Sequence, residues 1–184
     1  MMDSITQSHW ENLRAQDGNL RFEALNHMVA ATNQPVDWAY DVWDELLENL
    51  RHSDNHQRAI ATTLLCNLAK SDPEQRMLRD FDAIFAVTKD AKFVTARHSL
   101  QATWKVGAAG AQQQQLVVDR LAGRFRDCAA EKNCTLIRYD IIQGLHNLYA
   151  EVQDETVRET ALALIATEAD SKYRKKYASL WRSR

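Results

Sequence analysis

An arginine recurs about every 38 residues along this chain, each time at the head of an apolar helical stripe. In the segment DNHQRAIATTLLCNLAK, residues 54–70, Arg58 is followed by Ala61, Leu65 and Leu68 at offsets of three, seven and ten. These offsets place the apolar side chains on one face of a helix. The equivalent positions, separated by 37, 39, 41 and 36 residues, are Arg21, Arg58, Arg97, Arg138 and Arg174. A recurrence of this length predicts an array of structural repeats.

A second set of predicted helices lies between those that the arginines begin. In VDWAYDVWDELLENL, residues 36–50, apolar side chains fill one side of the helix and acidic side chains the other. Pro35 and Pro73, 38 residues apart, each stand where one of these helices is expected to begin. The sequence therefore predicts a single all-α domain over residues 1–184. Its five helical hairpins are expected at about 4–31, 36–69, 73–106, 111–149 and 152–182.

The composition agrees with a helical protein without a membrane-spanning part. Only five glycines and two prolines interrupt the 184 residues, which favours long helices and short turns. No apolar run approaches the ~20 residues that a membrane span needs. The opening residues MMDSITQSHW have neither the cationic start nor the apolar core of a secretion signal. We therefore expect a cytoplasmic protein.

The three cysteines are expected to be buried thiols in a reducing compartment. Their number is odd and they lack C-x-x-C spacing, so neither a disulfide framework nor a zinc knuckle is predicted. They are Cys66, Cys128 and Cys134. His52 and His56 flank Asp54 at a spacing that can bind metal on a helix, but the three residues span a predicted turn. We predict no metal site and no cofactor.

This pattern resembles the HEAT repeat family, to which armadillo-like repeats are related. In that family a turn aspartate and an arginine at the start of the second helix form a ladder between neighbouring repeats. The resemblance implies a right-handed α-solenoid whose arginines are structural, since a guanidinium can join a carboxylate to bare carbonyls of an adjacent turn. The fourth hairpin departs from the pattern, because its turn offers only Glu131 or Asn133. The ladder residues would be Asp17, Arg21, Asp54, Arg58, Asp90, Arg97, Arg138, Asp170 and Arg174.

The resemblance also indicates where a partner would bind. Second helices of such solenoids face the concave side, and positions one, five and eight after each arginine lie opposite the apolar stripe. In the first two hairpins these positions are chemically mild, with residues such as Phe22, Ala59 and Thr63. In the third and fourth hairpins they predict a surface that recognises a polar or acidic protein or peptide. Its residues are His98, Lys105, Tyr139, Gln143 and His146.

Catalytic signatures are absent from the sequence, and we predict a non-enzymatic binding scaffold. One alternative is enzymatic, because DNA glycosylases that remove alkylated purines are also built of HEAT-like repeats and use a concave tryptophan and an aspartate. The nearest candidates here are Trp104 and Asp140, but Trp104, like Trp43 and Trp181, lies on an apolar stripe and is expected in the core. Another alternative is a structural subunit of a larger assembly, for which an exposed apolar flank would be evidence.

Charge is unevenly distributed along the chain, whose formal net charge is −2. Residues 1–90 hold 15 acidic and 8 basic side chains, and residues 91–184 hold 10 and 15. The basic part is densest in SKYRKKYASLWRSR, residues 171–184. Such asymmetry can reflect a partner at one end, although solvated helix faces also produce it. Nucleic-acid binding is not expected, because few phosphates could be neutralised together.

Overall fold

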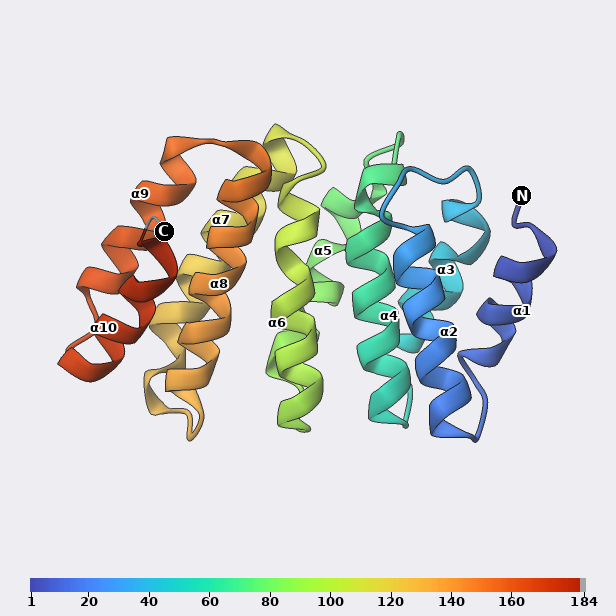
Figure 1. The fold of residues 1–184 in the computed structure, drawn as a ribbon, viewed down its shortest axis with the longest axis horizontal. Coiled ribbons are helices and arrows are strands. Elements are labelled where there is room, and N and C mark those ends of the chain that lie inside the picture. Colours follow the sequence, from blue (N-terminus) through green and yellow to red (C-terminus); the bar gives the residue numbers. More distant parts are fainter. Residues whose placement is uncertain (183–184) are drawn as a thin grey trace. The chain divides into compact units, whose positions relative to one another are not determined.

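The computed structural model describes residues 1–182, which form ten α-helices and four short 3-10 helices (Figure 1). No strand occurs in this part of the chain, so the all-helical prediction is confirmed. The α-helices are α1 (Ser4–Asn12), α2 (Gly18–Ala31), α3 (Ala39–Asn49), α4 (Asn55–Leu68), α5 (Arg76–Ala86), α6 (Phe93–Gly107), α7 (Ala111–Asp127), α8 (Cys134–Val152), α9 (Glu155–Ala166) and α10 (Ser171–Ala178). The 3-10 helices are η1 (Ala69–Ser71), η2 (Val87–Lys89), η3 (Cys128–Ala130) and η4 (Ser179–Trp181). None of the described helices combines the length and the apolar character needed to cross a membrane.

The prolines predicted to begin two of these helices lie ahead of them instead. Pro73 belongs to a turn, and α5 starts only at Arg76, because Gln75 has a φ of 55° and turns the chain into the helix. The carboxylate of Asp72 accepts hydrogen bonds from the backbone N–H groups of Arg76 at 2.9 Å and Met77 at 2.7 Å. An aspartate before the turn therefore stabilises the start of α5, and Pro73 does not occupy its first position.

The chain divides into two compact units, unit 1 over residues 1–102 and unit 2 over residues 103–184. The boundary falls inside α6, so no linker separates them. The single repeat domain expected from the sequence stays a prediction.

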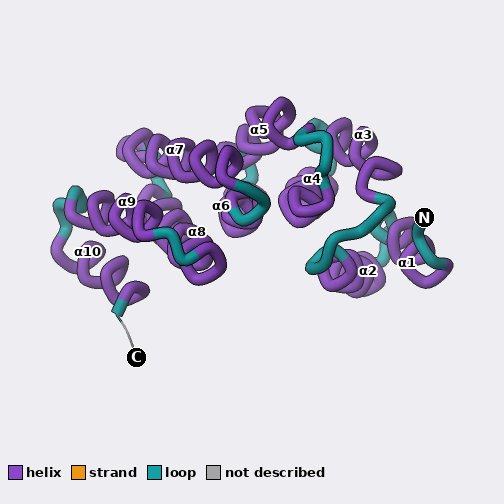
Figure 2. Tube along the Cα trace, turned by 90° about the horizontal axis from the view of Figure 1, so that it is seen from above, coloured by secondary structure: helices purple, strands orange, loops and turns teal. Residues whose placement is uncertain are grey.

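In unit 1 the helices form two layers. Helix α2 packs against α4 in one layer and α3 packs against α5 in the other, while α3 and α4 contact each other across the layers (Figure 2). The apolar stripe of α4 lies between the layers, with Ala61, Leu64, Leu65 and Leu68 each at most 1% exposed. Burying one leucine stabilises a fold by about 1.5–3 kcal/mol, so this stripe is a large part of the core of unit 1.

In unit 2, α7 and α9 form one layer and α8 and α10 the other. Phe125 of α7, Ile141 of α8 and Tyr177 of α10 have no exposed surface, and the rings of Phe125 and Tyr177 contact each other between the layers. A Cβ added at Gly107 would lie 2.9 Å from Cδ2 of Leu148, so the glycine lets the Leu148 side chain of α8 pack closely against the end of α6.

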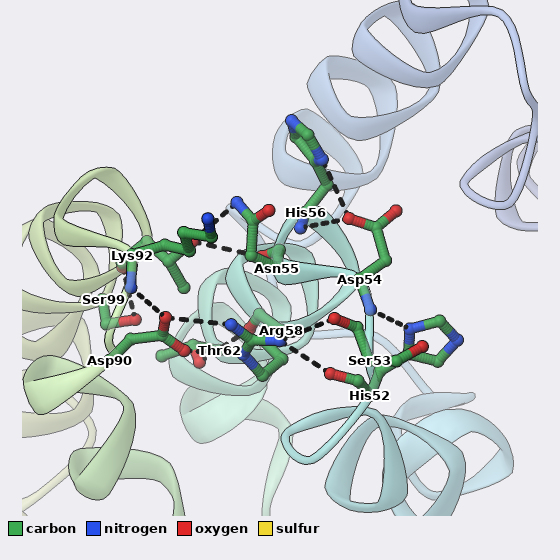
Figure 3. A network of polar contacts seen from close by, with 11 residues as sticks. His52, Ser53, Asp54, Asn55, His56, Arg58, Thr62, Asp90, Lys92 and Ser99 are labelled. Carbon is green, nitrogen blue, oxygen red and sulfur yellow. Dashed lines mark hydrogen bonds and ion pairs between the residues drawn. The ribbon is translucent and has the colours of Figure 1, made fainter.

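Arg58 connects the turn before its own helix to the turn of the next helical pair (Figure 3). Its Nη1 donates to the carbonyl oxygens of His52 at 2.8 Å and Ser53 at 3.1 Å. On the other side, Nε and Nη2 donate to the two carboxylate oxygens of Asp90 at 2.6 and 2.9 Å. The two side chains are only 18% and 7% exposed, and charges so far removed from water persist because they are paired. Asp54, four residues before Arg58, instead caps α4 by accepting from the backbone N–H of His56.

Other ladder arginines repeat parts of this geometry. Nη1 of Arg21 donates to the carbonyl oxygen of Ala15 at 2.9 Å, and Nη1 of Arg174 to that of Glu168 at 3.0 Å. In both cases, as in Arg58, the acceptor stands six residues before the arginine. Asp17 and Asp170 cap the helices of these arginines, α2 and α10. Arg97 lies half-buried on α6.

The fourth ladder arginine takes its carboxylate from a residue that the sequence did not indicate. Nη1 of Arg138 donates to Oε2 of Glu168 at 2.8 Å, and its Nε donates to the carbonyl oxygen of Phe125 at 3.1 Å. Glu131, one of the two partners offered by the turn, binds Arg124 instead, with Nη2 of Arg124 2.9 Å from Oε2. Glu168 stands two residues before the capping Asp170, and its longer side chain reaches Arg138 from there.

Cys128 and Cys134 form a disulfide, which corrects the prediction of three thiols. The two residues flank the turn between α7 and α8, and η3 folds the chain back so that their Cα atoms lie 5.2 Å apart. A spacing of six residues does not reveal this, because the pairing depends on the shape of the turn. Cys66 is a buried thiol of α4.

Replacing Arg58 with alanine is expected to lower the free energy of unfolding by about 1–3 kcal/mol. The loss arises because the Asp90 carboxylate and two carbonyl groups lose their donors. Arg58→Lys should recover only part of it, since an ammonium group cannot bind both carboxylate oxygens and the carbonyls together. Chemical denaturation measures the effect, with the exposed Arg51→Ala as the matched control. Equal stabilities of the Arg58 and Arg51 variants would contradict the structural role of Arg58.

The stabilisation by Arg58 is also expected to depend on pH. The hydrogen bonds from Arg58 hold the pKa of Asp90 below its ordinary value of 3.8. Because the folded-state pKa is depressed, the contribution is complete above about pH 5 and is lost as the pH falls through the folded pKa. The difference in unfolding free energy between wild type and Arg58→Ala should therefore be constant from neutral pH to about pH 5 and shrink below pH 4. A difference that does not shrink in acid would exclude the charge of Asp90 as its source.

Tyr177 is expected to titrate well above the ordinary tyrosine pKa of 10.0. Its hydroxyl donates to the carbonyl oxygen of Thr135 at 2.9 Å, and burial raises its pKa to about 12. Because the folded-state pKa is raised from 10.0, the stabilisation by neutral Tyr177 is complete below pH 10 and is lost as the pH rises towards 12. An ultraviolet titration at pH 9–13 should show an ionisation near pH 12 that Tyr177→Phe removes. If Tyr177→Phe instead removed an ionisation near pH 10, the result would contradict the burial of the Tyr177 hydroxyl.

Candidate functional site

An open groove of about 450 Å³ lies on unit 1, along the first turns of α2, α4 and α6. Its lining is mainly apolar and includes Phe22 and Leu25 of α2, Ala59 and Ile60 of α4, and Val94 of α6. Helix α4 forms the middle, because it packs against α2 on one side and is hydrogen-bonded to α6 on the other. Helix α4 therefore forms the floor of the groove.

Two apolar side chains of the groove are left open to solvent. Phe22 and Val94 are each 64% exposed, although most apolar side chains of unit 1 are buried. They belong to α2 and α6, the two helices on either side of α4. Apolar surface that the chain itself does not cover is the usual mark of a contact surface when it borders a groove.

The polar groups of the groove fix its shape. Nδ2 of Asn55 donates to Oγ1 of Thr95 at 3.1 Å, and Oγ1 of Thr95 donates to the carbonyl oxygen of Asn55 at 3.2 Å. These bonds tie the start of α4 to the start of α6. Nδ1 of the exposed His56 lies 2.9 Å from Oδ1 of Asp54, which orients the ring at the edge of the groove (Figure 3). His98 is exposed and also lines the groove.

The ladder determines which side chains face the groove. Phe22, Ala59 and His98 each stand one residue after a ladder arginine, and all three line the groove. Adjacent residues of an α-helix differ by about 100° in direction, so each of these side chains leaves the helix on another side than the arginine before it. Arg21 also lines the groove, so on α2 the ladder and the groove share the first turn of the helix.

Only one residue of the predicted binding surface, His98, lies at this groove. The other four belong to unit 2 and are half-buried. Three of them contact neighbouring side chains: Nζ of Lys176 lies 4.8 Å from the ring centroid of Tyr139, Nε2 of Gln143 donates to Asn147 at 3.0 Å, and His146 packs edge-on against Trp181 with centroids 5.0 Å apart. Nζ of the fourth, Lys105, lies 6.0 Å from the Trp104 ring centroid.

The polar residues of the sequence do not indicate this groove, because the exposed side chains that mark it are apolar. The offset from Arg21 already identifies Phe22 as solvent-facing, and an aromatic side chain at such a position is a signal for an apolar contact. Val94 gives no equivalent signal, because it stands before Arg97 and outside the offsets used. Its exposure follows from the start of α6 at Phe93.

The residues considered for chemistry do not form an open catalytic site. Asp140 is only 3% exposed, so the aspartate required by a glycosylase does not face solvent. Trp104 and Trp181 are half-buried, which corrects their expected place in the core, whereas Trp43 is fully buried. Within residues 1–182, no group of three histidine, cysteine, aspartate or glutamate side chains is arranged to hold a metal ion.

Comparison with known proteins supports the fold and no more. No family model matches the sequence, and no curated protein matches it. Nine chains of solved structures match the structure. One of them is described as an engineered protein solved by the Northeast Structural Genomics Consortium, and it is 14% identical. The match has a TM-score of 0.54 and covers 97% of this chain and 78% of that chain.

Proposed function

We propose that this chain is a non-enzymatic, HEAT-like module that binds a protein or peptide in the groove of unit 1. The recurrence of the ladder arginines, the pairs of helices between them and the bond from Arg58 to Asp90 support membership of the HEAT-like class and a right-handed α-solenoid. Solenoids of this kind commonly serve as binding surfaces, and this part of the proposal rests on analogy.

The observation that carries the proposal is the exposure of Phe22 and Val94 beside the groove. Fully burying an apolar side chain of this size is worth about 1.5–3 kcal/mol, so covering both would supply a substantial part of a binding free energy. The groove is open to solvent, so side chains of a partner can enter it, and helices α2, α4 and α6 form its walls. A partner that inserts one or two apolar side chains between α2 and α6 fits this arrangement.

The lining favours a protein partner over nucleic acid. Among the groove residues only Arg21 is a permanent cation, and its Nη1 already donates to the carbonyl oxygen of Ala15. Phosphate backbones are bound by several cations acting together, which this groove lacks. Of the residues predicted to bind a partner, His98 belongs to the proposed site. The four residues of unit 2 stay predictions.

The proposal is tested by selecting binders from a displayed peptide library and measuring their affinities by fluorescence anisotropy. Phe22→Asp and Val94→Asp should each weaken the selected peptides by about thirtyfold, as expected for a residue worth 2 kcal/mol at an interface. Ile5→Asp is the matched control, because Ile5 is also 64% exposed but belongs to α1, away from the groove. The Ile5→Asp variant should bind the selected peptides with the same affinity as the wild type.

Folding is checked separately by thermal unfolding of all three variants. Each replaces a solvent-exposed side chain, so the melting temperatures are expected to stay close to that of the wild type. A library that yields no peptides preferring the wild type over the Phe22→Asp, Val94→Asp double variant would contradict the proposal. Equal losses in the Ile5 control would do so as well.

A further inference from the structure

The last helix of unit 2 presents a row of lysines to solvent. Lys172, Lys175 and Lys176 are exposed on α10, and we call these three residues the lysine strip. Residues 171–182 contain no acidic side chain. Within residues 1–182, no carboxylate forms an ion pair with any lysine of the strip. The last two residues of the basic segment 171–184 lie outside the described residues.

The acidic residues that precede the strip are engaged elsewhere. Glu168 is only 5% exposed, accepts a hydrogen bond from Arg138 at 2.8 Å and accepts another from the backbone N–H of Asp170 at 3.0 Å. Asp170 caps α10 by accepting from the backbone N–H of Lys172 at 2.8 Å. Both carboxylates therefore serve the fold, and neither turns to the ammonium groups of the strip.

The lysines are spaced to present their charges on one face of α10. Positions 172, 175 and 176 are related as i, i+3 and i+4, so their side chains are neighbours on the helix surface. Aromatic rings hold two of them: Nζ of Lys172 lies 5.6 Å from the ring centroid of Tyr173, and Nζ of Lys176 lies 4.8 Å from that of Tyr139. A cation over a ring loses less freedom on binding an anion than a fully mobile lysine does.

We propose that the lysine strip binds an acidic segment of a partner protein, with glutamate or aspartate side chains one helical turn apart. Carboxylates at that spacing face the i, i+3 and i+4 lysines in turn, and residues 171–182 contain no acidic side chain that competes with them. This surface belongs to unit 2 and binds by charge, whereas the groove of unit 1 binds by apolar contact. The two proposals therefore stand on separate observations.

Two other anionic partners fit the strip less well. An anionic membrane surface is bound by helices that also insert apolar side chains, but Tyr177, on the inner side of α10, has no exposed surface. Single-stranded nucleic acid is bound by cations together with free aromatic faces, and here lysines cover a face of both Tyr139 and Tyr173. Helix α10 has eight residues and is about 12 Å long, which limits the number of phosphates it can contact.

The test is fluorescence anisotropy at about 50 mM salt, where exposed charges are weakly screened. The probe is a fluorescein-labelled, alanine-based helical peptide with glutamates at i, i+3, i+4 and i+7. Its counterpart has glutamine at the same positions and is expected to bind at least tenfold more weakly. Lys172→Gln with Lys175→Gln should weaken the glutamate peptide about five- to tenfold, from two exposed ion pairs. The matched control is Lys89→Gln with Lys132→Gln, which removes the same charge from two exposed lysines elsewhere and should change the affinity less than twofold.

Each outcome of these binding experiments either supports or contradicts the proposal for the lysine strip. Absence of binding to the glutamate peptide, equal binding of the glutamine peptide, or an equal loss in the Lys89, Lys132 control would overturn the proposal. Tighter binding of oligouridylate or of phosphatidylserine vesicles would replace the acidic protein segment with nucleic acid or membrane. The Phe22→Asp variant should bind the glutamate peptide as wild type does. Failure of the groove proposal therefore leaves the binding of the glutamate peptide unchanged. Failure of the lysine-strip proposal likewise leaves peptide binding in the groove unchanged.

Discussion

The paired guanidinium of Arg58 is the interaction on which the arrangement of unit 1 depends. Its Nη1 donates to two carbonyl groups of the turn before α4, and its Nε and Nη2 donate to the two carboxylate oxygens of Asp90. A charge so little exposed is costly unless every donor finds an acceptor, and that requirement fixes the distance between two successive turns. Arg138 satisfies the same requirement in unit 2 through Glu168 and the carbonyl of Phe125. The pairing thus joins turns that are far apart in the sequence within each unit.

Much of the fold follows from the sequence because burial along a helix is a local property. Apolar side chains at offsets of three, seven and ten from an arginine can meet the core only on one helix face, and in α4 they do. Features that depend on the shape of a turn do not follow. The late start of α5 requires the positive φ of Gln75, the disulfide requires the turn at η3, and the partner of Arg138 requires the reach of Glu168.

The candidate site was only partly predictable for a related reason. Periodicity identifies the face on which a side chain lies, and it placed Phe22, His98 and Tyr139 on equivalent faces. It does not tell whether a neighbouring element covers that face. Lys176 lies over Tyr139, whereas Phe22 keeps most of its surface in contact with water. The exposure of such a side chain depends on the side chains of the adjacent helix. A pattern of offsets along one helix does not give the lengths and directions of those side chains.

The position that follows each ladder arginine is occupied by chemically unrelated residues: Phe22, Ala59, His98, Tyr139 and Lys175. The arginine carries the architectural constraint, so its neighbour is free to vary without disturbing how successive turns are joined. Substitution at these positions would change the chemistry of the surface while the hydrogen bonds of the arginines stay in place. These five positions are therefore suitable for combinatorial randomisation. After gene duplication, changes at the same positions would alter the surface of a copy without altering the arginines that join its turns.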